Sequence, residues 1–185
     1  MDILKTIHER RSIRKYKPDA VPEEILLEIL EAARRAPSWA NTQTWRFIIV
    51  TEEETKKDLS SLLTPNNPAR IALLDAPLLI CIAAKKGLSG CLKGQAVTDK
   101  DDWFMFDAGI AMEHLVLAAW SFGLGTCHVR AFNAKQAEDI LEIPDGYAMV
   151  EMTPLGYFDT APSATPRKDM NNILYLNKFG KPYKK

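Results

Sequence analysis

A polar loop separates a helical pattern from a strand pattern at the stretch APSWANTQTW, residues 36–45. In the preceding residues 22–35, apolar side chains recur at helical spacing with charged side chains opposite, which predicts an amphipathic helix. In the following residues 45–51, aromatic and β-branched side chains predominate, which predicts a strand. The chain is therefore expected to combine helices and strands.

The loop itself is rich in amide and hydroxyl side chains, among them Ser38, Asn41 and Gln43. Such side chains can offer several hydrogen-bond donors and acceptors to a planar heterocycle. Ser38 and Asn41 can equally well bond to their own backbone and cap the adjacent elements. The loop alone leaves both interpretations open.

Outward from the loop, helical patterns interleave with few strand patterns. Further helices are predicted over residues 52–63, 103–122 and 134–141, with a short helix ending at Asp75. Strands are predicted over residues 77–84, where a continuous apolar run indicates burial, and over residues 147–152. Residues 127–132 fit a short strand or an extended loop, and residues 169–176 a short helix or strand. The pattern predicts one α+β domain over residues 1–185.

Two segments in the second half of the chain depart from the ordinary patterns. Residues 85–102 are polar, glycine-containing and weakly patterned, so we expect a mobile insertion or lid there. The helix over residues 103–122 is apolar around most of its circumference, which places it in a large core or at a subunit interface. We favour the interface because the chain is small. Gly123 and Gly125 are expected to end this helix at positions that require a positive φ.

The bulk composition excludes several classes of protein. A chain of 185 residues, 46% hydrophobic and 26% charged, can bury a core without a disulfide or metal. Its net charge of zero argues against a nucleic-acid partner. Cys81, Cys91 and Cys127 lack the spacing of a metal site. The first residues lack a secretory signal, and no apolar run reaches the ~20 residues that span a bilayer. We therefore expect no membrane partner and a cytoplasmic location.

A basic cluster, RRSIR, occupies residues 10–14. The guanidinium groups of Arg10, Arg11 and Arg14 match the geometry of phosphate oxygens, and the Ser12 hydroxyl adds a donor. By itself the cluster fits a solvated basic turn better than a binding site.

Five short motifs follow one another along the chain: RRSIRKY (residues 10–16), APSWANTQTW (36–45), GLGTC (123–127), PLGY (154–157) and PRK (166–168). In this order and spacing the chain resembles the nitroreductase family of FMN enzymes over essentially its whole length. The resemblance implies a central, mostly antiparallel sheet flanked by helices, with the long apolar helix at a dimer interface. It also implies a homodimer with two FMN sites, each built where the subunits meet.

The resemblance assigns residues of this chain to the flavin. It gives the phosphate and ribityl contacts to the basic cluster, through Arg10, Arg11, Ser12 and Arg14, and has the C-terminal pair Arg167 and Lys168 close over the same phosphate. The loop from the other subunit would contact the isoalloxazine and ribityl groups through Ser38, Asn41 and Gln43. The segment after the glycine turn, around Val129, Arg130 and Ala131, would offer a backbone N–H to the flavin N5 edge.

One residue departs from the family pattern. Many members carry glycine beside the N5 edge, whereas this chain has Arg130. The arginine side chain can narrow the pocket, attract anionic substrates or point away from the flavin, and the sequence does not choose among these.

The activity implied by the resemblance is a two-step flavin reaction. NADH or NADPH gives a hydride to FMN, and a small acceptor such as a nitroaromatic or quinone is then reduced. No catalytic side chain is expected, because the flavin carries the chemistry. The alternatives are a protein that stores or senses FMN without turnover and a flavin-free interaction module. Glu113 and His114 could form a proton-handling pair, but structural contacts are favoured for both; His8 and His128 are isolated in the sequence.

Overall fold

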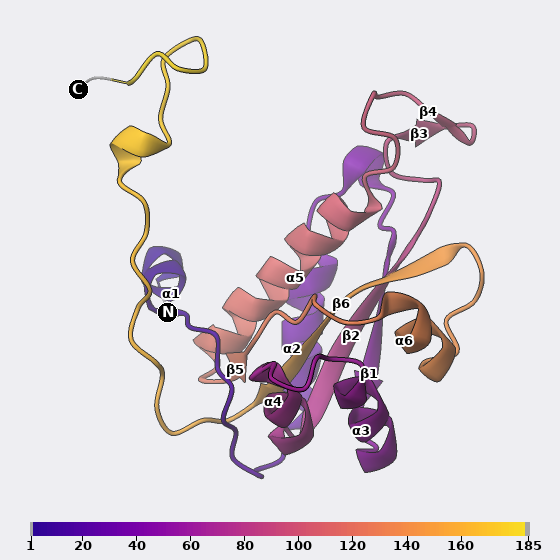
Figure 1. Cartoon of the computed structure of the whole chain (residues 1–185), viewed down its shortest axis with the longest axis vertical. Helices are drawn as coiled ribbons and strands as arrows, with labels where there is room; N and C mark the ends of the chain where they lie inside the picture. Colours follow the sequence, from indigo (N-terminus) through magenta and orange to yellow (C-terminus); the bar gives the residue numbers. More distant parts are fainter. Residues whose placement is uncertain (1, 184–185) are drawn as a thin grey trace.

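A four-stranded antiparallel sheet lies at the centre of the structure, a computed structural model that describes residues 2–183 (Figure 1). The strand order is β1–β2–β6–β5, and every neighbouring pair is antiparallel. The strands are β1 (Trp45–Val50), β2 (Leu78–Lys85), β5 (Gly125–Thr126) and β6 (Tyr147–Gly156). This confirms the α+β class and the antiparallel sheet expected from the sequence.

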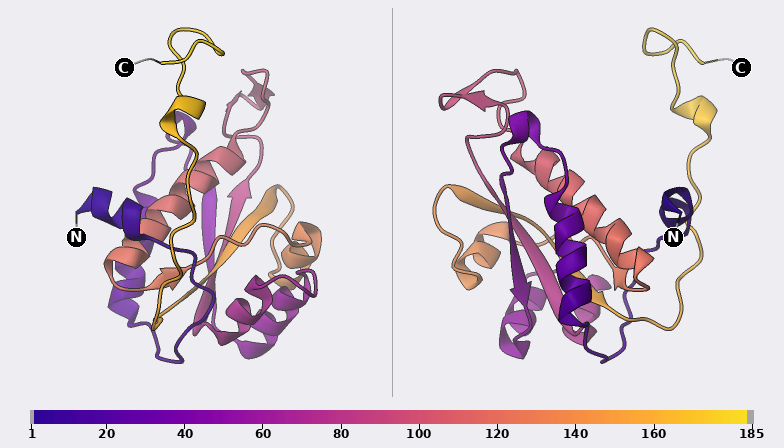
Figure 2. Two further views of the ribbon diagram at one scale, coloured as in Figure 1. Left: turned by 60° about the vertical axis from the view of Figure 1, so that its left-hand side comes forward. Right: turned by 180° about the vertical axis from the view of Figure 1, so that it is seen from behind.

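Helices cover both faces of the sheet (Figure 2). The helices α2 (Glu23–Arg34) and α5 (Phe104–Ser121) pack on one face, and α3 (Glu53–Ser61), α4 (Ala69–Asp75) and α6 (Ala134–Ile140) on the other. Along β2, Ile80 and Ile82 join the first core, whereas Leu79 and Cys81 join the second. A strand covered on both faces reads as an unbroken apolar run, and this explains the run at residues 77–84.

Helix α5 contributes the largest helical share of the core, and its predicted place at a dimer interface stays a prediction. Its buried face includes Ala108, Met112, Leu115 and Ala119, and it packs against α2 and the sheet. Its first turn nevertheless exposes large apolar side chains, with Met105 62% and Phe106 59% exposed. The helix therefore serves the core along one face and leaves apolar surface uncovered at its N-terminal end.

The two glycines after α5 have different roles. Gly123 has a φ of 77°, as expected for a residue that ends a helix. The expectation of positive φ at Gly125 is wrong, because Gly125 lies in β5. A Cβ there would lie 2.6 Å from Cγ1 and 2.7 Å from Cβ of Ile13. Gly125 is therefore needed for the close approach of the N-terminal segment to the sheet.

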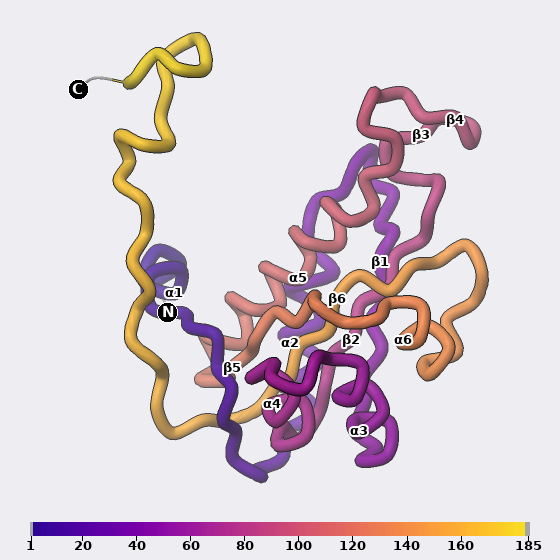
Figure 3. Tube along the Cα trace, viewed as in Figure 1, coloured from indigo at the N-terminus to yellow at the C-terminus, as the bar shows by residue number. Residues whose placement is uncertain are grey.

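The polar insertion at residues 85–102 extends beyond the end of the sheet as a small hairpin (Figures 1 and 3). Its strands are β3 (Cys91–Leu92) and β4 (Gln95–Ala96). The hairpin folds back onto Trp103, whose N–H donates to the carbonyl of Ser89 and whose indole donates to the Thr98 hydroxyl. A Cβ on Gly90 would meet the Trp103 ring at 2.4 Å, so the hairpin is closely packed at its base.

Both ends of the described chain lie outside the layered body (Figure 3). The helix α1 (Ile3–Glu9) precedes the basic cluster, and the tail after Tyr157 runs past α1 in an extended form. Residues 159–183 are exposed throughout and contain a short 3₁₀ turn, η2 (Met170–Asn172), and an isolated antiparallel bridge between Tyr175 and Pro182. Among the helices of residues 2–183, none is long and apolar enough to cross a membrane.

Candidate functional site

The basic cluster lies along the end of the sheet. The N–H of Ile13 donates to the carbonyl of Thr126 at 2.8 Å, and Ser12 forms a parallel bridge with the same residue. The Tyr16 hydroxyl donates to the Ile13 carbonyl at 2.7 Å, and the Ile13 side chain is buried against Gly125. The backbone that carries the arginines is therefore held rigidly by β5 and is no free surface turn.

The cluster carries more positive charge than the chain neutralises. Among residues 2–183, no ion pair involves Arg10, Arg11 or Arg14. Arg11 donates to the carbonyls of His8 and Arg10, which accounts for its orientation. The Nε of Arg10 is buried and has no acceptor within the described residues. A buried donor without a partner is costly, so this cluster fits an anion such as a phosphate monoester.

A buried thiol adjoins the cluster. The Cys127 thiol lies close enough to Ser12, Arg14 and Arg10 for these residues to act on it. Burial raises the pKa of the Cys127 thiol, and this outweighs the opposing effects of Arg14 and Ser12. Cys127 is therefore protonated at neutral pH and lies at the edge of the site.

The loop after α2 has an unusual backbone. Three non-glycine residues adopt left-handed conformations, with φ values of 44° at Ala40, 57° at Asn41 and 46° at Gln43. The Ser38 hydroxyl accepts from the Gln43 N–H at 2.9 Å, and the Gln43 amide donates to the Asn41 side chain at 3.1 Å. The loop side chains thus bond within the loop, as one of the two interpretations of the sequence expected. Strain of this kind is retained where surrounding contacts impose it, and it occurs often at binding sites.

A buried carboxylate on α5 holds this loop in place. Asp107 is 1% exposed and accepts from the Trp39 N–H at 3.1 Å and from the Thr42 hydroxyl at 3.5 Å. Sequence reasoning missed Asp107, because an acidic residue in the first turn of a helix is ordinary. Only the fold brings it under the loop.

Replacing Asp107 with alanine is expected to lower the free energy of unfolding by about 2–3 kcal/mol, because the Trp39 N–H loses its acceptor and the strained loop loses its anchor. Urea unfolding followed by far-UV circular dichroism measures this. The matched variant Asp107→Asn keeps one carbonyl acceptor and is expected to lose about half as much. Equal stability of wild type and Asp107→Ala would contradict the anchoring role.

In the segment after the glycine turn, one backbone N–H is used by the sheet and two are not. The Val129 N–H donates to Met152 at 2.9 Å and the Met152 N–H donates back at 3.1 Å, so Val129 is part of the sheet. Arg130 and Ala131 are exposed, and no hydrogen bond of residues 2–183 uses their N–H groups. Of the three residues expected beside a flavin, Arg130 and Ala131 can offer an N–H and Val129 cannot.

The remaining predicted residues lie apart in one chain. Arg167 donates to Thr165 and to no other described residue, and Lys168 is exposed beside it in the tail. Within residues 2–183, no hydrogen bond or ion pair joins the loop or the tail to the basic cluster. Within one chain, the basic cluster and the segment after the glycine turn are therefore joined through β5. In the described part of the chain, the loop and the tail are not bonded to either of them.

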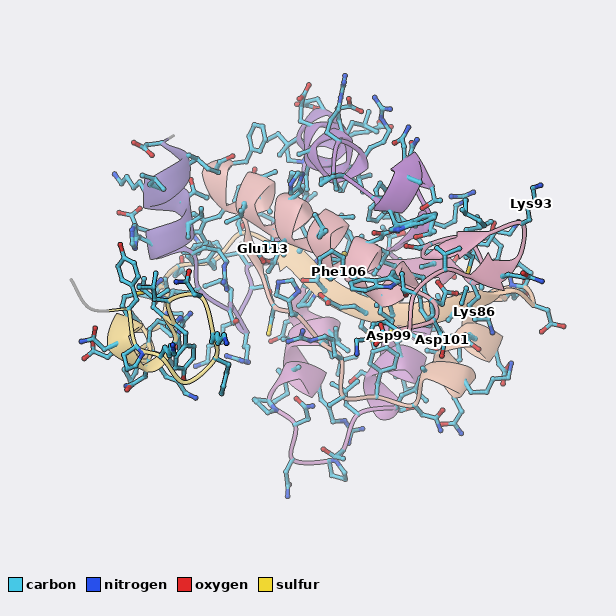
Figure 4. The ribbon with its side chains drawn as sticks, turned by 90° about the horizontal axis from the view of Figure 1, so that it is seen from above. Lys86, Lys93, Asp99, Asp101, Phe106 and Glu113 are labelled. Atoms are coloured by element: carbon cyan, nitrogen blue, oxygen red, sulfur yellow. The ribbon has the colours of Figure 1, made fainter. Side chains whose placement is uncertain are left out.

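The structure also assembles a charged cluster that the sequence did not reveal. His128 contacts Glu151 of β6 through Nδ1 and Glu113 of α5 through Nε2, the latter at 3.3 Å. His128 is therefore not isolated, contrary to expectation. His114 faces elsewhere and contacts the Ala32 carbonyl at 3.2 Å, which confirms a structural contact for it. Glu113 lies in the middle of α5, and Phe106 lies nearer the polar insertion (Figure 4).

Metal ligation is not supported by the described part of the chain. No group of three or more His, Cys, Asp or Glu side chains within residues 2–183 is arranged to hold a metal ion. Asp99 and Asp101 on the insertion lie close to Lys86 in projection and belong to an exposed, mixed-charge surface (Figure 4).

Comparison with known proteins identifies the family. The nitroreductase family model matches residues 7–157. A nitroreductase family protein from Clostridium novyi NT is 35% identical with a TM-score of 0.76, covering 99% of this chain and 97% of that one. An FMN-dependent nitroreductase from Clostridium difficile R20291 is 31% identical with a TM-score of 0.79, covering 95% and 99%. The FMN reductase (NAD(P)H) of Bacillus subtilis is 32% identical, covering 77% of this chain and 60% of the relative.

The chain belongs to the nitroreductase family. This confirms the family expected from the order of the five motifs. It also confirms the expected class of enzyme, an NAD(P)H-dependent flavin oxidoreductase.

Proposed function

We propose that this protein binds FMN and uses NADH or NADPH to reduce a small acceptor such as a nitroaromatic or a quinone. The observation that carries the proposal is the buried Arg10 Nε, which has no acceptor within the described residues and lies in a cluster of arginines without ion pairs. The names of the similar proteins from Clostridium difficile and Bacillus subtilis support FMN and NAD(P)H.

The residues present fit an FMN phosphate. In this proposal Arg10 and Arg14 neutralise the phosphate charge, the Ser12 hydroxyl donates to it, and Arg11 contributes positive potential. Arg130 or Ala131 donates a backbone N–H to the edge of the ring. Bound FMN supplies hydride acceptance and donation, so the chain itself binds, orients and excludes water, and no catalytic side chain is assigned.

We further propose a homodimer in which each flavin site is shared. Within one chain the loop with Ser38, Asn41 and Gln43 and the pair Arg167 and Lys168 make no bond to the basic cluster, as expected if a second subunit brings them together. The exposed apolar residues of the tail need a covering surface. These residues are Ile173, Leu174, Tyr175, Leu176 and Phe179.

The acceptor is proposed to enter an apolar cavity beside the loop. This cavity of about 360 Å³ is lined by Ser38, Trp39, Trp103, Phe106 and Ile110, among others. Aromatic walls favour a planar, apolar acceptor over a strongly charged one. A larger depression of about 470 Å³ lies against β1 and α2. Of the loop before β1, the larger depression includes only Gln43, whereas Pro37, Ser38 and Trp39 all line the smaller cavity, so we assign the acceptor to the smaller one.

Phe106→Ala is expected to raise the KM for an aromatic acceptor by about threefold to tenfold, because one face of the cavity is lost. The rate of flavin reduction by NAD(P)H should change less than twofold. Steady-state and rapid-mixing kinetics separate the two. Met105→Ala is the matched control, since Met105 is 62% exposed and does not line the cavity. An unchanged KM in Phe106→Ala would exclude this cavity as the acceptor site.

The competing function is FMN storage or sensing without turnover. Aerobic oxidation of NADH or NADPH, measured with a panel of quinones and nitroaromatics, distinguishes the two functions. Acceptor-dependent oxidation of either nicotinamide supports the enzyme, and FMN-loaded protein that oxidises neither supports storage.

A further inference from the structure

A half-buried histidine between two carboxylates joins three elements near the basic cluster. His128 follows β5, Glu151 lies in β6, and Glu113 lies in α5. The side chains of His128 and Glu151 are 21% and 4% exposed, and that of Glu113 is 43% exposed. This cluster is used by no step of the function proposed above.

The cluster favours a doubly protonated imidazole ring. Burial opposes the charge on His128, but the hydrogen bonds and charges of Glu113 and Glu151 outweigh it and raise the pKa of His128 to about 9. Burial also opposes the charge on Glu113, yet His128, Arg10 and His114 together lower the pKa of Glu113. A charged ring donates from both nitrogens, whereas a neutral ring donates from one and leaves a carboxylate without its donor.

The position of His128 in the chain gives this cluster a role. On its N-terminal side, Thr126 pairs with Ser12 and Ile13 of the basic cluster. On its C-terminal side, Val129 pairs with Met152, and the N–H groups of Arg130 and Ala131 follow. His128 is therefore two residues after Thr126, which pairs with the basic cluster, and two and three residues before Arg130 and Ala131, which can face the edge of the flavin ring.

Other charged groups near the cluster favour the same arrangement. The charge of Arg10 acts on Glu113 and on Cys127, and that of Glu151 acts on Cys127 as well. The charge of His114, the next residue on the same helix, also acts on Glu113. Glu113 thus contacts His128 directly and is influenced by the charge of Arg10.

We propose that His128, held between Glu113 and Glu151, is a positioning residue that fixes the Arg130–Ala131 backbone relative to Arg10. FMN is then held in one geometry, with its phosphate at the basic cluster and its ring edge at the Arg130–Ala131 backbone. The proposal rests on the FMN site proposed above. It assigns His128 no contact with the flavin; the residue acts through the backbone on either side of it and through Glu113.

This role makes FMN affinity depend on pH. The pKa of His128 in the folded protein is about 9, so the ring keeps its charge at lower pH and loses it as pH rises through that value. Because the proposed geometry requires the charged ring, FMN affinity should be constant at lower pH and should fall as pH rises through about 9. A histidine with a merely structural role, such as His114 against the Ala32 carbonyl, produces no such step.

The test is the FMN dissociation constant of the full chain, measured by flavin fluorescence between about pH 6 and pH 10. Wild type should bind FMN about tenfold more weakly at the alkaline end. His128→Gln and His128→Asn each keep one neutral donor, so they should bind about tenfold more weakly at pH 7 and show no step. His114→Asn is the matched control and should retain the step.

A step that FMN itself or another residue produces would persist in His128→Gln, and that result overturns the proposal. Glu113→Gln supplies a second measurement if the His128 variants do not fold. Since it removes one of the two carboxylates, it should move the midpoint of the step to lower pH, and an unmoved midpoint also overturns the proposal. Wild type that binds no FMN at any pH contradicts the proposed function itself, so the two failures are distinguishable.

Discussion

Replacing Arg10 and Arg14 together with alanine is expected to weaken FMN binding by about two to four orders of magnitude. Each charge-assisted hydrogen bond to phosphate contributes about 1.5–3 kcal/mol where water is excluded, so the two losses sum to about 3–6 kcal/mol. Arg10 carries a buried nitrogen without an acceptor among the described residues, which makes it the larger contributor. Fluorescence titration of the apoprotein with FMN measures the change.

The double variant should remain folded, because the backbone of the basic cluster is held by the Ile13 and Tyr16 hydrogen bonds rather than by the arginines. Arg34→Ala/Arg35→Ala is the matched control: both arginines are exposed, and among residues 2–183 they form ion pairs only with Glu31 on α2. It should bind FMN as wild type does. Full flavin occupancy in the Arg10/Arg14 variant would exclude the basic cluster as the phosphate site.

Truncating the chain after residue 159 is expected to convert a dimer into a monomer and to weaken FMN binding more than tenfold. The truncation removes the exposed apolar tail residues together with Arg167 and Lys168. It leaves the layered body intact, including the Lys17–Asp159 ion pair at 2.6 Å and the stacking of Trp120 on Phe158. In the proposed dimer these apolar side chains supply contact area, and an interface below the usual size does not hold two subunits together. Sedimentation velocity gives the oligomeric state.

A full-length Arg167→Ala/Lys168→Ala variant separates the two effects of truncation. It keeps the apolar tail and should remain a dimer, while FMN binding weakens because two positive charges are lost. Wild type that sediments as a monomer with flavin bound would contradict the shared site. A truncated chain that remains a dimer would show that the tail is not part of the interface.

The sequence predicts the architecture well, because periodicity reports burial directly. The apolar run at residues 77–84 became β2, which is covered on both faces, and the amphipathic pattern at residues 22–35 became α2. The role of Gly125 was predicted wrongly, since its lack of a side chain serves contact with Ile13 across the sheet. Such close approaches depend on segments far apart in sequence and leave no local pattern.

The candidate site was predicted in parts. The basic cluster and the polar loop could be proposed as site segments because donors and cations are concentrated within a few residues, and their roles remain predictions. Asp107 and His128 were missed because each acquires its partners only when α5, the segment after β5 and β6 come together. Whether Val129 or its neighbours offer a free N–H also depends on the pairing with Met152, which residue types do not specify.

The measurement that tests the central claim most directly is anaerobic addition of NADH, and separately of NADPH, to the FMN-loaded protein. We predict that at least one nicotinamide bleaches the absorbance of the oxidised flavin. We also predict that a quinone or nitroaromatic added afterwards restores that absorbance. Flavin that stays oxidised with both nicotinamides would contradict an NAD(P)H-dependent oxidoreductase and would favour FMN storage.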